Sequence, residues 1–123
     1  MYKTKESPKV LYLSYDGMTD PLGQSQVLPY LKGLSQEGYD FDLISFEKKD
    51  KFRVHKREIE SSIEDFTIQW IPKFYTKSPP ILSTVYDVYI LFREVERLHK
   101  RNQYDFIHCR GYITSLVGLK MKL

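Results

Sequence analysis

Short apolar runs alternate along the chain with longer stretches in which apolar residues recur at helical spacing. Each short run is bounded by turn signals or charged residues, which is typical of a buried strand. The first run ends at Asp16-Gly17, and Pro72 is expected to end the third. The predicted strands cover residues 9–15, 41–46, 66–71 and 105–109.

Four helices are predicted from apolar residues that repeat every three or four positions. They cover residues 25–38, 47–65, 81–101 and 112–123, and residues 73–80 are expected to form a loop. Pro29 is awkward in the first helix, because a proline in a helix interior costs about 3 kcal/mol. We therefore expect this helix to start late, near Ser25, or to bend at Pro29.

The order is therefore strand and helix in strict alternation, which requires parallel strands joined by right-handed crossovers. The fold class predicted is α/β, with a Rossmann-like parallel sheet in the order 3-2-1-4 flanked by helices. Four parallel strands leave an exposed edge, and the sequence stops inside the last predicted helix. We expect the chain to be the first part of a larger protein.

Composition agrees with one globular domain, since 41% of the 123 residues are hydrophobic and 28% are charged. The net charge of +3 is only mildly basic. Cys109 is the single cysteine, so no internal disulfide forms, which favours the cytoplasm. Residues 1–8 are polar and unlike a signal peptide, and no apolar run approaches the ~20 residues of a membrane helix.

The loop after the first strand is the first candidate for chemistry. Ligands of open parallel sheets bind beyond the carboxyl ends of the strands, where the strand order reverses. Glycines allow a close approach of the backbone, and a following helix start offers N–H groups to an anion. The loop matches neither the dinucleotide fingerprint nor the Walker motif, and an ordinary turn explains it equally well. The candidate ligand-binding residues of this loop are Gly17, Asp20, Gly23 and Gln24.

The second candidate loop follows the fourth strand and should face the same crevice. Arg110 offers a planar donor fork for phosphate or carboxylate, and Gly111 begins the turn. His108 is more simply explained as a packed strand residue. No Cys/His cluster has metal spacing and no catalytic triad can be argued, so no metal and no cofactor are predicted.

A run of basic residues between positions 48 and 57 has two interpretations. It could contact an anionic membrane or a nucleic acid. More often such a run is a solvated helix face, and acidic residues such as Glu47 and Glu58 flank it. The tyrosines form no stacking platform of the kind that single-strand binders use, so nucleic acid is disfavoured.

The motifs at the two loops resemble the amino-terminal domain of GT-B glycosyltransferases, in the family 4-like group that builds bacterial surface polysaccharides. Residues 10–15 and 21–39 carry the first part of the likeness, with Gly23, Gly33-Leu34 and Gly38-Tyr39 at the expected places. Residues 104–111 are similar to the family's Asp-hydrophobic-hydrophobic-His-x-His-Gly segment. Arg110 stands where that family usually has its second histidine.

The resemblance implies that residues 1–123 form a truncated acceptor-binding domain. Its partners would be a saccharide or lipid-linked acceptor and a nucleotide-sugar donor, the latter bound mainly by a carboxyl-terminal domain that this sequence lacks. The loop at Gly23 would then lie near the donor phosphates, and this chain alone should not catalyse transfer. The location would be cytoplasmic, with peripheral contact to the inner face of the membrane. The alternative is a stand-alone Rossmann-like ligand-binding module without catalysis.

Overall fold

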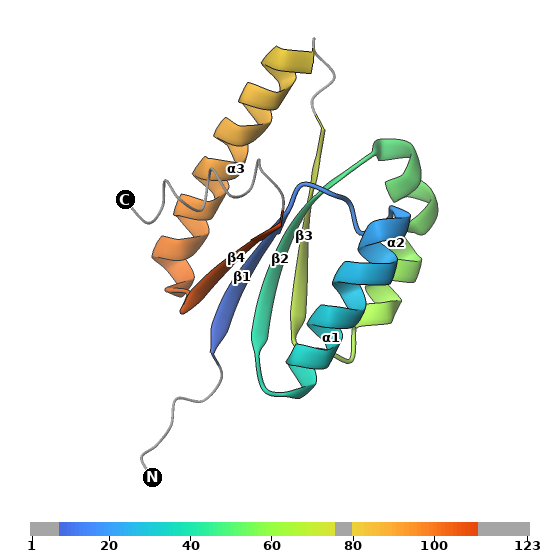
Figure 1. Cartoon of the computed structure of the whole chain (residues 1–123), viewed down its shortest axis with the longest axis vertical. Coiled ribbons are helices and arrows are strands. Elements are labelled where there is room, and N and C mark those ends of the chain that lie inside the picture. Colours follow the sequence, from blue (N-terminus) through green and yellow to red (C-terminus); the bar gives the residue numbers. More distant parts are fainter. Residues whose placement is uncertain (1–7, 76–79, 111–123) are drawn as a thin grey trace.

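The computed structural model describes residues 8–75 and 80–110 of the chain. Four strands and their connecting helices follow one another in alternation (Figure 1). The strands are β1 (Lys9–Ser14), β2 (Asp40–Glu47), β3 (Ile68–Phe74) and β4 (Phe106–Arg110). The helices are η1 (Gly23–Val27), which is a π-helical turn, α1 (Leu28–Gln36), α2 (Lys49–Ile63) and α3 (Pro80–Asn102).

All strand pairs are parallel, and the order in the sheet is β3-β2-β1-β4. The centre of β1 pairs with both neighbours, since Leu13 lies opposite Ile44 of β2 and Cys109 of β4. This confirms the Rossmann-like fold class and the predicted strand order. The order reverses between β1 and β4, so the segments that follow these two strands lie at the switch point of the sheet.

Two apolar layers sandwich the sheet, because successive side chains of a strand point to opposite faces. On one face α1 and α2 cover a core that includes Tyr12, Leu31 and Ile59. On the other face α3 packs through Leu91 and Val95 against the strands. Burial on both faces explains why the strands appear in the sequence as apolar runs.

The third strand extends beyond Pro72, which contradicts the predicted end at residue 71. Pro72 pairs with Ser45 of β2, and the strand continues to Phe74. A proline is tolerated in an edge strand, because its missing N–H can face away from the sheet. The predicted loop at residues 73–80 therefore begins later than expected.

The first helical segment begins earlier than predicted, at Pro21 rather than near Ser25. The amide of Gln24 already bonds the carbonyl of Asp20 at 3.1 Å, and Pro21 suits a first helical position because it needs no N–H partner there. The wide turn η1 then precedes Pro29, with Leu28 N–H bonded to Gly23 O. A wider turn moves aside the carbonyl with which the Pro29 ring would clash.

The remaining boundaries differ from the predicted ones by one or two residues. Gly38 ends the first helix with a φ of 107°, a conformation that favours glycine. Arg110 is the last residue of β4 rather than part of a loop.

The predicted helix at 112–123 lies outside the described residues. Within the part that is described, no helix combines the length and hydrophobicity needed to cross a bilayer.

Candidate functional site

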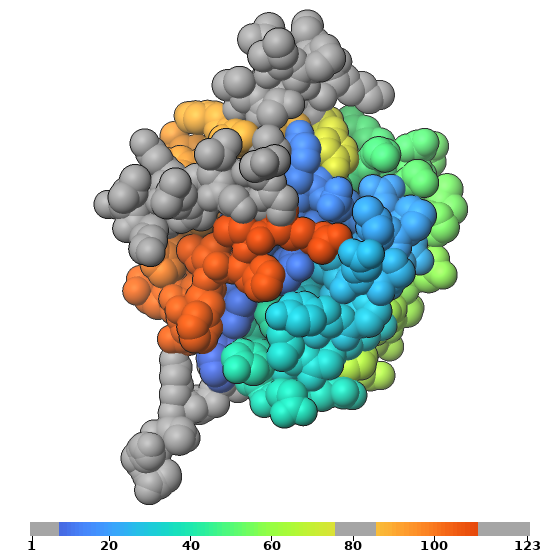
Figure 2. Space-filling model, viewed as in Figure 1, coloured from blue at the N-terminus to red at the C-terminus, as the bar shows by residue number. Residues whose placement is uncertain are grey.

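Arg110 joins the end of β4 to the segment that follows β1. Its Nη2 donates a hydrogen bond to Oε1 of Gln26 at 2.8 Å, and its Nε lies 3.6 Å from Oδ2 of Asp16. Figure 2 shows the orange-red atoms of β4 beside the blue atoms of this segment. The structure thus brings the two predicted segments together at the switch point, with a half-buried cation between them.

Tyr12 of β1 adds a hydroxyl group to the surroundings of Arg110. Burial raises the pKa of Tyr12, while the charge of Arg110 and a hydrogen bond to it act in the opposite direction. The ring of Tyr12 also stacks on His108, with 4.6 Å between the centroids. The side chain of Tyr12 therefore lies against both Arg110 and His108 of β4.

Glu47, at the end of β2, organises the loop between β1 and η1. Its fully buried carboxylate accepts hydrogen bonds from Met18 N at 2.8 Å and from Thr19 N and Oγ1 at 3.1 and 2.7 Å. Ser45 Oγ also donates to it, and Trp70 Nε1 donates to Ser45 Oγ at 2.8 Å. A buried charge tolerates this environment because its oxygens are paired. Through these hydrogen bonds Glu47 attaches the loop to the end of the neighbouring strand β2 and fixes its conformation.

From the sequence, Glu47 was expected only to begin the second helix and to flank the basic run. A signal was present, because Phe46 and Glu47 continue an apolar strand without a turn residue between them. A carboxylate placed there lies at the carboxyl edge, beside the loop of the adjacent strand.

The two loop glycines are required by packing within the protein. A Cβ on Gly23 would lie 2.2 Å from Gly17 O and 2.7 Å from Met18 Cα. A Cβ on Gly17 would lie 2.5 Å from Oε1 of Glu47. Both glycines are therefore needed for the close packing of the loop, and contact of their backbone with a ligand stays a prediction.

The polar residues of the loop are also engaged. Asp20 lies 3.8 and 3.9 Å from the ammonium groups of Lys48 and Lys51 at the start of α2. The side-chain amide of Gln24 turns back to Thr19 O at 3.3 Å. Asp20 thereby connects the loop to α2, and Arg110 connects it to β4. Gly111 lies outside the described residues.

Two tyrosine hydroxyls and a buried carboxylate lie together at the same edge of the sheet, on the face that α3 covers. Tyr15 donates a hydrogen bond to Oδ2 of the buried Asp87 at 2.7 Å, and the hydroxyl of Tyr75 donates to the carbonyl of Tyr15. Burial raises the pKa of Tyr75, and the nearby charge of Asp16 adds to the rise. This group was not predicted from the sequence, because Tyr15 and Asp87 are 72 positions apart.

His108 gives a testable pH dependence. Burial lowers its pKa from the usual 6.5, so the folded state holds the proton less tightly than the unfolded chain. Stability should therefore be full above pH ~6.5 and fall as the pH drops from there toward the folded pKa. Between about pH 7.5 and 5.5, urea denaturation should show a larger loss for the natural chain than for His108→Phe, which keeps the stacking. Equal losses would contradict this assignment.

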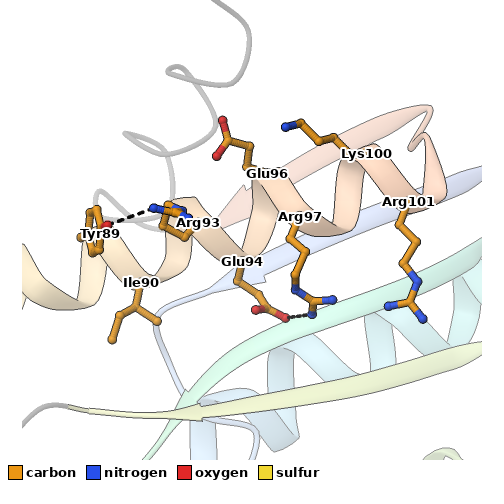
Figure 3. Close-up of a pocket in the computed structure, with 8 residues that line it drawn as sticks. All are labelled: Tyr89, Ile90, Arg93, Glu94, Glu96, Arg97, Lys100 and Arg101. Carbon is orange, nitrogen blue, oxygen red and sulfur yellow. Dashed lines mark hydrogen bonds and ion pairs between the residues drawn. The ribbon is translucent and has the colours of Figure 1, made fainter.

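A separate hollow lies along the outer surface of α3 (Figure 3). Its volume is ≈ 810 Å³, and its lining comes from this helix alone. Charges within it pair with one another, since Arg97 Nη2 bonds Oε2 of Glu94 at 2.5 Å and Arg93 bonds the Tyr89 hydroxyl at 3.0 Å. It is away from the strand ends, and no converging polar groups from other elements line it.

In the described ranges, no group of three or more His, Cys, Asp or Glu side chains is arranged to hold a metal ion. No protein-family model, curated protein or solved structure matches the chain. The class of protein is therefore assigned from the fold alone. The chain is an α/β protein with a Rossmann-like parallel sheet and a cluster of polar side chains, Arg110, Asp16 and Gln26, at its switch point.

Proposed function

We propose that the chain is the acceptor-binding, amino-terminal domain of a cytoplasmic GT-B glycosyltransferase. The enzyme would transfer a sugar from a nucleotide-sugar to a saccharide or lipid-linked acceptor in surface polysaccharide synthesis. A second domain would carry most of the donor site, and transfer would occur between the two. The sequence resemblance suggests this family, and the geometry of the carboxyl edge supports it.

The observation that carries the proposal is the position of Arg110 between the two switch-point segments. A guanidinium held at this edge can bind phosphate oxygens through two parallel N–H bonds. Asp16 is a weak competitor for the guanidinium of Arg110, because the side chain of Asp16 is 50% exposed and its oxygen is 3.6 Å away. A diphosphate can take the place of Asp16 without leaving a buried charge unpaired.

The loop that Glu47 holds positions the start of the helix and is not itself proposed to contact the ligand. Two bridges, Glu47 to the loop backbone and Asp20 to α2, fix the helix start next to Arg110. A rigid donor group stabilises developing charge on a leaving diphosphate better than a mobile one, because no reorganisation is needed during the reaction.

The test is sugar transfer by the full-length natural protein with a panel of nucleotide-sugars. Arg110→Ala should lower kcat/KM at least about tenfold, which corresponds to about 1.4 kcal/mol of transition-state stabilisation. Arg57→Ala removes the same charge from the exposed surface of α2 and should leave the rate unchanged. Equal rates for both variants would exclude the role of Arg110. Ligand binding without any transfer would instead favour a stand-alone binding module.

A further inference from the structure

We propose that the groove between α1 and β4 binds a hydrocarbon chain that carries a phosphate or diphosphate head. The contact of the head with Arg110 rests on the proposed function. The site of the chain goes beyond that function, because it lies on one face of the sheet and needs neither a second domain nor sugar transfer.

Two lines of side chains form the walls of the groove. Alternate residues of a strand point to one face of the sheet, and His108 pairs with Tyr12, which belongs to the core under α1. The β4 residues on this face are therefore Phe106, His108 and Arg110. Residues four apart lie on one side of a helix. The residues of η1 and α1 that meet β4 follow this spacing and are Gln26, Tyr30 and Leu34.

The two lines contact each other from the carboxyl edge of the sheet toward the amino edge. At the carboxyl edge Gln26 accepts a hydrogen bond from Arg110 at 2.8 Å. Next along the groove, the ring centroids of Tyr30 and His108 are 6.0 Å apart. A strand rises about 3.3 Å per residue, so the groove extends ~13 Å from Arg110 to Phe106. This length suits an extended chain better than a single ring.

A hollow of ≈ 360 Å³ occupies the end of the groove away from Arg110. Its floor includes the buried side chains of Val10 and Phe41. Its rim includes Tyr30 and Phe106, which are 48% and 59% exposed. Figure 2 shows this face, with the orange-red atoms of β4 beside the cyan atoms of α1. Large apolar side chains exposed around a hollow are typical of a ligand site.

A hydrocarbon chain fits this lining better than a saccharide does. Among the described side chains that line the hollow, only Tyr30, Tyr39 and His108 carry a polar atom. A bound sugar ring would leave several of its hydroxyl groups without partners, and each of these costs free energy when it is buried. A hydrocarbon chain needs no partner and gains free energy in proportion to the apolar area that it buries.

The charge of the groove is concentrated at one end. The described lining of the hollow contains no acid, lysine or arginine, whereas the guanidinium of Arg110 lies at the carboxyl edge. A phosphate or diphosphate matches the guanidinium, because it accepts two parallel N–H bonds from it. The distribution of charge along the groove therefore matches an amphiphile with its head at Arg110 and its chain between Tyr30 and Phe106.

The experiment measures by calorimetry how much a chain adds to the affinity of its head group for the full chain of the protein. Geranyl diphosphate should bind at least about tenfold more tightly than pyrophosphate, because the chain is buried in the hollow. Decyl phosphate against inorganic phosphate tests a straight chain in the same way, and a tenfold gain in either pair supports the site.

Tyr30→Ser/Phe106→Ser is the test variant, and Tyr86→Ser/Tyr89→Ser removes two exposed rings from α3 instead. The test variant should reduce the gain from the chain to less than about threefold and leave pyrophosphate affinity unchanged. The α3 variant should keep the full gain.

A second variant fills the hollow without removing a ring. Leu34→Trp places a larger side chain in its wall and should also abolish the gain from the chain, while unchanged affinity for pyrophosphate shows that the protein is folded. Equal gains in the test variant and the α3 variant would overturn the proposal. So would a larger gain from the sugar of glucose 1-phosphate than from the chain of decyl phosphate.

The remaining outcomes separate this site from the proposed function. Equal affinities for geranyl diphosphate and pyrophosphate, both lost in Arg110→Ala, would overturn the chain site and leave the anion contact of the proposed function intact. Chain-dependent binding that Arg110→Ala leaves unchanged would contradict the proposed function and the place of the head, and would retain the site of the chain. Dimerisation of the ligand-free protein through residues 30–34 and 106–108 would show that a second copy covers the hollow, which would also overturn the proposal.

Discussion

Replacing Gly23 by alanine is expected to destabilise the protein by at least about 2 kcal/mol. The added methyl group would lie 2.2 Å from the carbonyl oxygen of Gly17 and 2.7 Å from Met18 Cα. Both neighbours are backbone atoms of the loop that hydrogen bonds to Glu47 hold in place. The clash therefore cannot be relieved by turning a side chain. Overpacking of this kind costs 1–3 kcal/mol or more. Urea denaturation of the two proteins measures the difference.

Gly33→Ala is the matched control for this prediction. Gly33 lies inside α1, and a Cβ there would meet no atom within 4 Å. Alanine is the better helix former by roughly 0.5–1 kcal/mol, so this variant should be as stable as the natural chain or more so. If both alanine variants had the same stability, the close packing of the loop on the helix start would be refuted.

The Glu47→Gln variant should lose about 2–3 kcal/mol of stability and disorder the loop at residues 16–20. The amide has nearly the shape of the carboxylate, but it replaces one acceptor by a donor. Met18 N–H and the two donors of Thr19 now share the two carboxylate oxygens, so at least one would face an N–H group in the variant. An unsatisfied buried donor costs 1–3 kcal/mol, and more beside a charged group.

The control for Glu47 is Glu60→Gln, on the exposed surface of α2. That change should alter stability by less than about 0.5 kcal/mol. Backbone amide exchange at Met18 and Thr19 gives a second measure, since both amides should exchange faster in Glu47→Gln alone. Protection that is unchanged there would show that the carboxylate is not what fixes the loop.

The layout of the sheet could be predicted because it depends on local patterns. The apolar run at 9–15 and the alternation of strands and helices suffice for parallel strands. The order 3-2-1-4 was one common order for such a sheet, and the structure has it. The main errors in the predicted boundaries of strands and helices concerned two prolines. Pro72 was expected to end a strand, but β3 is an edge strand, where the missing N–H matters little. Pro29 was expected to delay the helix start or to bend the helix. The helix starts earlier, at Pro21, and the turn η1 accommodates Pro29.

The candidate site was predictable only in its location. The carboxyl edge and Arg110 follow from topology, and the structure brings Arg110 against Gln26. The partners of the loop could not be predicted, because they depend on contacts between distant residues. Glu47 is 29 residues from Met18, and Tyr15 is 72 residues from Asp87. The packing role of Gly17 and Gly23 could not be predicted for the same reason, because the atoms that an added Cβ would meet include those of Glu47, which is distant in the sequence.

The proposed function depends on the binding of a diphosphate-bearing ligand by Arg110 together with the β1–η1 segment. Two-dimensional ¹⁵N–¹H spectra of the chain, titrated with nucleotide-sugars and short-chain prenyl diphosphate saccharides, test it directly. We expect saturable shifts of the amides at residues 16–26 and 108–110, which should vanish in Arg110→Ala and persist in Arg57→Ala. Shifts confined to the outer surface of α3, or shifts that Arg110→Ala leaves unchanged, would contradict it.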